Sequence, residues 1–210
     1  MKNEKLAKLA DELDKCTACS FRESAIAPVG WFGNPESPIV FVGEGPGGVE
    51  DDYGCPLIGP SGQLLDNPLW SVQMTRDRVL TTNGRKCRPR NNKTPNIAEA
   101  DFCGKLWLEK ELAIIEPKVI VALGGVALHF LGNADMRITK DRGQWFKTAQ
   151  GFDCIATFHP AYLLRLSGHD LVTAKWDVFH DLEAARDKVI AAAPDYHLAS
   201  EAPTNLFALF

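Results

Sequence analysis

The sequence predicts an α/β fold with a central, mostly parallel, four-stranded sheet flanked by helices. Short runs of β-branched and other apolar residues alternate with segments of helical periodicity, as expected of parallel strands joined by helices. With 210 residues and 45% hydrophobic content, the chain can bury one sizeable core. We therefore expect a single domain over residues 1–192, followed by a flexible tail over residues 193–210. The four expected strands are 39–42, 79–82, 118–123 and 153–158.

The helices are predicted from apolar spacing and from glycine and proline positions. Leu6, Leu9 and Leu13 form one stripe on a charged N-terminal helix. Pro117 stops a strong helix in which Phe102 shares the apolar face. The remaining expected elements are a helix interrupted by Pro68 over 61–74, helices over 97–115, 124–131 and 171–192, and a β-rich stretch over 136–146.

A glycine-rich loop follows the first expected strand. Residues 43–48, Gly-Glu-Gly-Pro-Gly-Gly, match the dinucleotide fingerprint G-x-G-x-x-G. Three acids, Glu50, Asp51 and Asp52, come where a pyrophosphate needs positive potential, and no clear helix is expected to open at Gly48. We therefore interpret the match as accidental and the loop as a different kind of binding site.

Chemically useful residues end three of the expected strands. The glycine-rich loop follows the first strand, Asn83 the second and His159 the fourth. In open α/β sheets, ligands bind at the carboxyl ends of strands. The sequence therefore predicts one ligand site built from these three loops.

Charge and cysteine content limit the classes of function. The formal net charge of −4 argues against a globally basic nucleic-acid binder, and no apolar run is long enough for a membrane span, so we expect a cytoplasmic protein. Six cysteines in such a chain favour metal or redox chemistry over disulfides, and the C-x-x-C pair Cys16 and Cys19 favours metal ligation. The basic stretch 85–93 is either a solvated loop or a phosphate contact.

Three motifs together resemble a known family. These are GEGPGGVED from Gly43, NGRKCRPRNNKTP from Asn83 and HPAYLLR from His159. In order and spacing they are similar to the iron–sulfur-containing uracil-DNA glycosylases called family four, from about Cys16 to the closing helix. The resemblance implies the uracil-DNA glycosylase fold and a monofunctional, monomeric repair enzyme. Such an enzyme flips uracil out of single- or double-stranded DNA and hydrolyses its N-glycosidic bond, leaving an abasic site.

The resemblance also implies a cofactor, a [4Fe–4S] cluster. The matching ligands are Cys16, Cys19, Cys87 and Cys103, and thiolates are the usual ligands of such clusters. Zinc held by the same four thiolates is the alternative. Of the two remaining cysteines, Cys154 is expected in the core and Cys55 has no ligand role.

By the same resemblance, His159 donates a hydrogen bond to the departing uracil anion, and Asn83 reads the base edge and rejects cytosine. Glu44 positions water or stabilises the sugar cation, and the backbone of Gly43 and Gly45 faces the base. Where the family usually carries a phenylalanine that stacks on uracil, this chain has Leu57. A pocket that tolerates a modified pyrimidine is therefore an alternative reading.

DNA contacts are expected at two places. Arg88 and its basic neighbours in 85–93 would neutralise phosphates. Leu163, Leu164 and Arg165 resemble the wedge that enters the duplex, with at least one of the two leucines expected in the core.

Two other classes of function stay open on the sequence. One is a catalytically weak or silent DNA-binding module that keeps the cluster, and the other is a small-molecule enzyme that binds a nucleotide at the glycine-rich loop. The apolar end of the tail, residues 205–210, also resembles peptides that dock on the replication sliding clamp.

Overall fold

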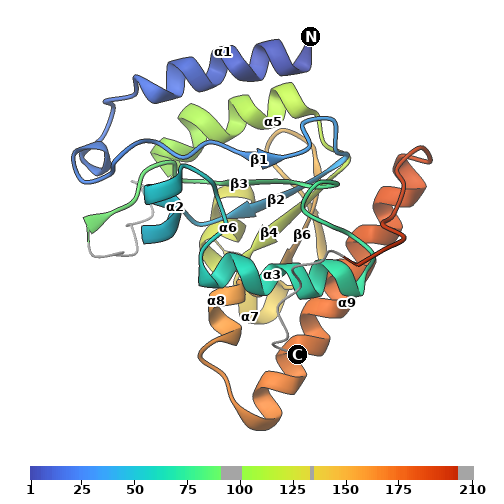
Figure 1. Cartoon of the computed structure of the whole chain (residues 1–210). Helices are drawn as coiled ribbons and strands as arrows, with labels where there is room; N and C mark the ends of the chain where they lie inside the picture. Colours follow the sequence, from blue (N-terminus) through green and yellow to red (C-terminus); the bar gives the residue numbers. More distant parts are fainter. Residues whose placement is uncertain (91–100, 133–134, 203–210) are drawn as a thin grey trace.

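The computed structural model describes residues 1–90, 101–132 and 135–202 (Figure 1). Within these ranges the strands are β1 (Phe32–Gly33), β2 (Ile39–Gly43), β3 (Leu80–Asn83), β4 (Val119–Leu123), β5 (Trp145–Lys147) and β6 (Asp153–Thr157). The helices are α1 (Lys2–Asp14), η1 (Ser20–Glu23), α2 (Gly48–Tyr53), α3 (Pro60–Ser71), η3 (Gly104–Leu108), α5 (Glu109–Ile115), α6 (Gly124–Leu131), α7 (Ile138–Asp141), α8 (Pro160–Leu163) and α9 (Gly168–Ala192).

The strands form one sheet in the order β1-β3-β2-β4-β6-β5. The four inner strands are parallel, which confirms the predicted α/β fold, and they are the four expected from the sequence. The edge strands β1 and β5 run antiparallel and were not counted in the four-stranded prediction. Each has only two or three residues, too few for an alternation pattern to show.

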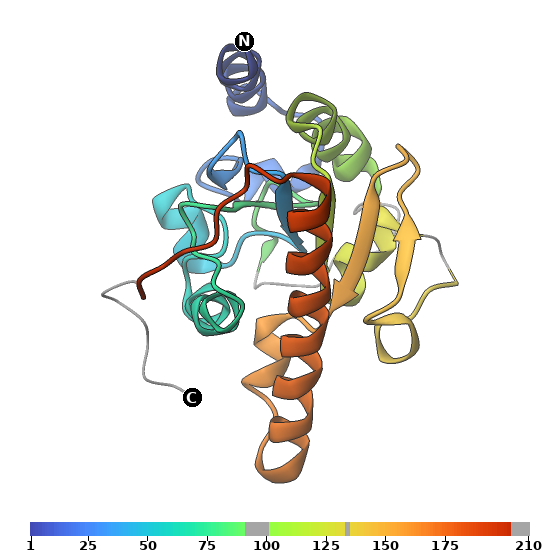
Figure 2. The ribbon, with the colours of Figure 1, turned by 90° about the vertical axis from the view of Figure 1, so that its right-hand side faces the viewer.

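Helices cover both faces of the sheet (Figures 1 and 2). Alternate residues of β2 point to opposite sides: Phe41 packs in one core cluster with residues of α3 and α9, and Val40 packs in the other with residues of α5 and α6. α1 lies outside α5, and Leu6, Leu9 and Leu13 are buried there as predicted. Burial on both faces explains why the central strands β2 and β4 are continuously apolar.

Two helix predictions were wrong. A helix does open at Gly48, because the Glu50 side chain accepts a hydrogen bond from the backbone N–H of Gly47 at 3.1 Å and so caps the first turn. Pro68 does not interrupt α3; it is buried within the helix.

Two further differences concern which side chains of a helix face the core and where the β-structure begins. Gly104–Leu108 is π-helical, and the wider turn places Cys103 and Trp107 inward while Phe102 is 48% exposed, not on the buried face. The stretch 136–146 contains the short helix α7 before β5, so only its end is β-structure.

The first part of the expected tail packs against the domain. Tyr196 and Leu198 contact the core cluster beneath α3 and α9, and Ala199 is buried. The flexible-tail prediction for residues 203–210 falls outside the described residues. Among the described helices, none is long and apolar enough to cross a bilayer.

Candidate active site

The carboxyl ends of the parallel strands bring the predicted motifs together. Gly43 at the end of β2 lies in register with Asn83 at the end of β3. β6 ends at Thr157, and His159 follows two residues later as the N-cap of α8. Gly124, at the end of β4, has φ +85° and packs against His159, because a Cβ there would lie 2.8 Å from the His159 Cβ. The three loops therefore open onto the same edge of the sheet.

Asn83 is the most informative residue at this edge. Its side chain is 1% exposed and lies directly over Gly43, where any Cβ would collide with the Asn83 Oδ1. Within the described residues, neither Oδ1 nor Nδ2 has a hydrogen-bond partner. An unsatisfied buried amide costs roughly 1–3 kcal/mol, and a ligand that pairs with both atoms would offset that cost.

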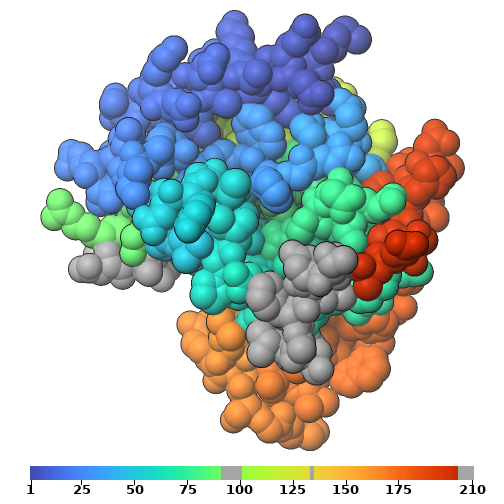
Figure 3. All heavy atoms as spheres, in the orientation of Figure 1, coloured from blue at the N-terminus to red at the C-terminus, as the bar shows by residue number. Residues whose placement is uncertain are grey.

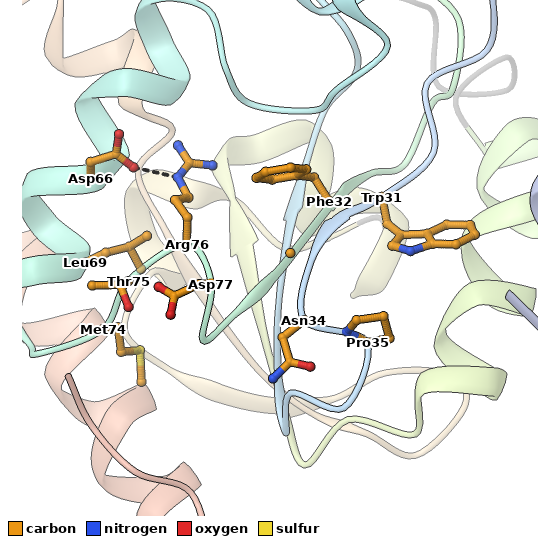
Figure 4. A pocket seen from close by; sticks show the side chains of 11 residues that line it. Trp31, Phe32, Asn34, Pro35, Asp66, Leu69, Met74, Thr75, Arg76 and Asp77 are labelled. Carbon is orange, nitrogen blue, oxygen red and sulfur yellow. Dashed lines mark hydrogen bonds and ion pairs between the residues drawn. The ribbon is translucent and has the colours of Figure 1, made fainter. Parts of the chain in front are cut away.

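Leu57 lies beside this amide. Its Cδ2 is 3.6 Å from the position of a Cβ on Gly43, and its side chain is 5% exposed. Its backbone has φ +57°, an uncommon conformation for leucine. Arg76 holds it there: its Nη2 donates to the Leu57 carbonyl at 2.9 Å, and its Nε pairs with Asp66 (Figure 4).

A cavity of about 780 Å³ is lined by residues including Phe32, Asn34 and Arg76, whose side chains are drawn in Figure 4. It lies beside β1 and the residues that precede β3, at the opposite end of β3 from Asn83. It is therefore separate from the edge where the motifs meet.

Glu50 is a site residue that the sequence reasoning misread. Its carboxylate is 8% exposed and accepts hydrogen bonds from Gly47 N–H at 3.1 Å and from Gly59 N–H at 2.7 Å. It therefore joins both ends of the loop that carries Leu57. Asp51 likewise accepts from the Ile26 N–H. An acidic residue at the third position after Gly47 is a sequence signal of a capped helix start, so this role of Glu50 could have been predicted.

His159 is held in one tautomer. Its Nδ1 accepts the Ala161 N–H at 3.1 Å, which leaves the proton of a neutral ring on Nε2. Burial and the nearby Arg165 cation lower its pKa to about 4, and the Glu50 carboxylate opposes this shift. The ring is therefore a neutral N–H donor throughout the physiological range.

Glu44 and Gly45 lie against Arg85. The Glu44 carboxylate is 3.9 Å from the Arg85 guanidinium, and a Cβ on Gly45 would come within 2.6 Å of the same group. The Glu44 side chain is 32% exposed, so solvent reaches it. A partly exposed carboxylate beside a cation can orient water.

The expectation that all basic residues of 85–93 neutralise phosphate was wrong for two of them. Arg85 is 3% exposed and its Nε donates to the Cys87 carbonyl at 3.0 Å. Lys86 is 1% exposed, and its Nζ lies 2.7 Å from Glu111 Oε2. Arg90 is exposed and Arg88 is partly exposed beside Gly48, whereas Lys93 falls outside the described residues.

The segment after α8 separates its two leucines. Leu163 is 5% exposed and belongs to the core, which confirms the expectation for one of the pair. Leu164 is 55% exposed and Arg165 is also exposed. Of the predicted wedge, only these last two side chains are available to DNA in this conformation.

Among the described residues, the four cysteines of the expected cluster do not form a preassembled metal site. Burial, together with the nearby thiols of Cys103, Cys19 and Cys16, raises the pKa of the Cys87 thiol to about 12. Yet among the described residues no three His, Cys, Asp or Glu side chains are close enough together to hold a metal ion. All six cysteines are free thiols, and Cys154 is buried in the core as predicted.

The chain matches the model of the uracil DNA glycosylase superfamily over residues 31–183. It is 41% identical to a type-4 uracil-DNA glycosylase from Thermotoga maritima over 179 residues, 85% of this chain and 91% of the relative. It is 36% identical to a type-4 enzyme from Archaeoglobus fulgidus and 32% identical to one from Pyrobaculum aerophilum, in each case over 77% of this chain and 84% of the relative.

Proposed function

Because the chain belongs to the type-4 uracil-DNA glycosylases of the uracil DNA glycosylase superfamily, we propose that the site at the carboxyl edge of its sheet excises uracil from DNA. The enzyme is a DNA-repair hydrolase of the N-glycosidic bond. Uracil has to leave the base stack to reach Asn83, which lies at the base of the glycine-rich loop.

The unsatisfied amide of Asn83 carries this proposal. Its Nδ2–H can donate to uracil O4 and its Oδ1 can accept from uracil N3–H. Cytosine presents an amino donor and an unprotonated N3, so the same amide would face two mismatched pairs. The backbone of Gly43 and Gly45, which has no side chain in the way, would lie against the base.

We assign the leaving-group role to His159. As the glycosidic bond breaks, the sugar gains positive charge and the uracil ring gains negative charge on its oxygens. The Nε2–H of a neutral imidazole can donate to one of those oxygens, as a donor does in an oxyanion hole. Glu44 would stabilise the sugar cation or orient the attacking water.

The decisive experiment is incubation of the protein with uracil-containing oligonucleotides, single-stranded and paired, followed by alkaline cleavage at abasic sites. We expect strand breaks at uracil and none at cytosine or thymine. Binding without breaks would identify a silent DNA-binding module. Breaks only at a modified pyrimidine would identify a different substrate base.

Replacing Leu57 with Phe is expected to improve uracil capture. An aromatic ring stacks on a base with roughly 1–3 kcal/mol, whereas leucine offers only apolar area. The left-handed backbone at this position strains either residue alike. We expect kcat/KM for uracil excision to rise up to about tenfold, which corresponds to 1.4 kcal/mol.

Leu57→Ala provides the matched control and should lower kcat/KM. The melting temperature of each variant separates pocket effects from overpacking. A Leu57→Phe protein of unchanged melting temperature that excises uracil more slowly would show that the aromatic ring is not what this pocket lacks.

Double replacement of Arg88 and Arg90 by Ser is expected to weaken DNA binding on every sequence alike. Each phosphate contact contributes about 0.9 to the slope of log K against log salt on duplex DNA, so the slope should become shallower by about 2. Replacing Lys5 and Lys8, two exposed lysines on α1, removes the same charge elsewhere and should leave the slope unchanged. Equal slopes for the two double variants would exclude the Arg88 face as the phosphate contact.

The cofactor proposal is a [4Fe–4S] cluster held by Cys16, Cys19, Cys87 and Cys103. The thiols of Cys103, Cys19 and Cys16 lie close enough to raise the pKa of Cys87, which supports the proposal, since a cationic iron centre would relieve their mutual repulsion. When bound, such a cluster would tie the end of α1 to the loop after β3 and to η3. The Lys86 N–H donates to the Cys103 sulfur at 3.4 Å, as a backbone amide does to a ligating thiolate.

We propose the replication sliding clamp as a partner of residues 205–210, a segment that lies outside the described residues. Such binding requires the apolar end of the chain to be available to another protein.

A further inference from the structure

An apolar groove runs between α3 and α9, away from the glycine-rich loop. It encloses about 590 Å³ and is mostly apolar. Figure 3 shows the face on which α3 meets the orange α8 and α9. Its lining residues include Ser71, Leu163, Val172, Lys175, Trp176 and Phe179.

Large apolar side chains are exposed along this groove. Trp176 is 59% exposed and Val172, one helical turn earlier, is 54% exposed. The Trp176 ring packs edge-on against Phe179 at 5.7 Å, so it forms a firm wall. Contiguous exposed apolar surface of this kind marks a docking site.

The described chain arrives at the edge of this groove. The Ala199 N–H donates to the carbonyl of Gln73 at 2.8 Å, and Gln73 lies two residues beyond Ser71 of the groove wall. Ala199 is 5% exposed, so this point is fixed. The described residues stop at 202, three positions later.

We propose that residues 206–210, Leu-Phe-Ala-Leu-Phe, bind in this groove of their own chain. Eight residues follow position 202, and at about 3.3 Å each they span at most about 26 Å, enough to cover a groove that begins beside the anchor. The four large apolar side chains suit apolar walls. Tethering raises the effective concentration of the segment to the millimolar range, which favours this occupant over a free partner.

Charge argues against nucleic acid as the occupant. Among the described lining residues, Lys175 is the single cation, whereas a DNA-binding groove needs several to neutralise phosphates. The groove also receives Leu163 from α8, the helix that starts at His159 and ends next to Leu164. A segment bound in the groove would therefore contact α8 through Leu163.

Hydrogen exchange on the full-length protein tests the proposal. We expect the amides of 206–210 to be protected. Trp176→Glu, which places a charge in the groove, should lower that protection by about tenfold or more, as for a local opening that becomes 1.4 kcal/mol easier. Ile190→Glu, at an exposed apolar position of α9 outside the groove, is the matched control and should change nothing.

A second measurement uses a labelled peptide of residues 203–210. It should bind a full-length variant with Phe207→Ser and Phe210→Ser, whose groove is open, and fail to bind the unaltered protein. Equal binding to both, or protection of 206–210 that survives Trp176→Glu, would overturn the proposal. Protection that appears only with dimer formation would assign the segment to a second copy, and protection that appears only with sliding clamp would assign it to that partner. Uracil excision is measured separately, so its presence or absence decides neither result.

Discussion

Replacing His159 is expected to slow uracil excision by about 10²–10³-fold, the usual effect of removing one donor to a developing oxyanion. His159→Asn is the most direct variant, because asparagine can still accept the Ala161 N–H and cap α8 but lacks the Nε2–H donor. The measurement is the single-turnover rate on a uracil-containing duplex with enzyme in excess. Substrate affinity should change little, since the charge develops only as the bond breaks.

His180→Ala is the control, since this histidine on α9 has a 64% exposed side chain. Its rate should equal that of the unaltered protein. A His159→Asn protein that keeps the full rate would remove the leaving-group assignment and leave the Asn83 pocket to be explained by binding alone.

The pH dependence separates a neutral donor from a charged one. The pKa of His159 is lowered to about 4, mainly by burial, so the ring is neutral above about pH 5 and its contribution to the rate should be flat from there to pH 8. Because the folded state binds this proton less readily than the unfolded state does, His159 also costs stability as pH falls from 6.5 towards 4. A rate that rises on acidification through pH 6.5 would identify an imidazolium donor instead.

Replacing Cys87 with Ala is expected to remove the cluster and its colour. The purified protein should be brown with iron bound, and the Cys87→Ala protein should be colourless by absorption and by iron analysis. Losing a few kcal/mol of metal-linked stability should lower the melting temperature by on the order of 10 °C in a protein of this size. The loop from Arg85 onward should become more accessible to protease.

Cys55→Ala is the matched control, because Cys55 is partly exposed and matches no ligand position. It should retain iron and colour. If anaerobically prepared protein lacks iron while excising uracil, the cluster proposal fails. If it holds zinc on the same four thiols, the ligand set stands and the metal assignment changes.

Local sequence determined the inner sheet and the loops that end its strands. Runs such as Ile39–Gly43 and Val119–Leu123 are apolar throughout, and a continuous apolar run of that length is a strand buried on both faces. Parallel pairing then brings Gly43 and Asn83 to one edge whatever else the chain does. The family motifs lie in these same segments, so fold and function could be predicted together.

Tertiary structure alone decided which charged and apolar side chains are available. Lys86 reads as one more cation of a basic loop, but it is buried because Glu111, 25 residues later, meets it at 2.7 Å. Leu163 and Leu164 are adjacent and identical in type, yet only Leu164 is exposed. The Leu163 side chain, at the end of the short helix α8, packs in the core with residues of α9. The Glu50 carboxylate fixes the loop that carries Leu57, because it accepts a hydrogen bond from the N–H of Gly59, nine residues later. Whether a charged side chain or a leucine is buried depends on partners that lie far away in the sequence. The neighbouring residues alone therefore cannot predict it.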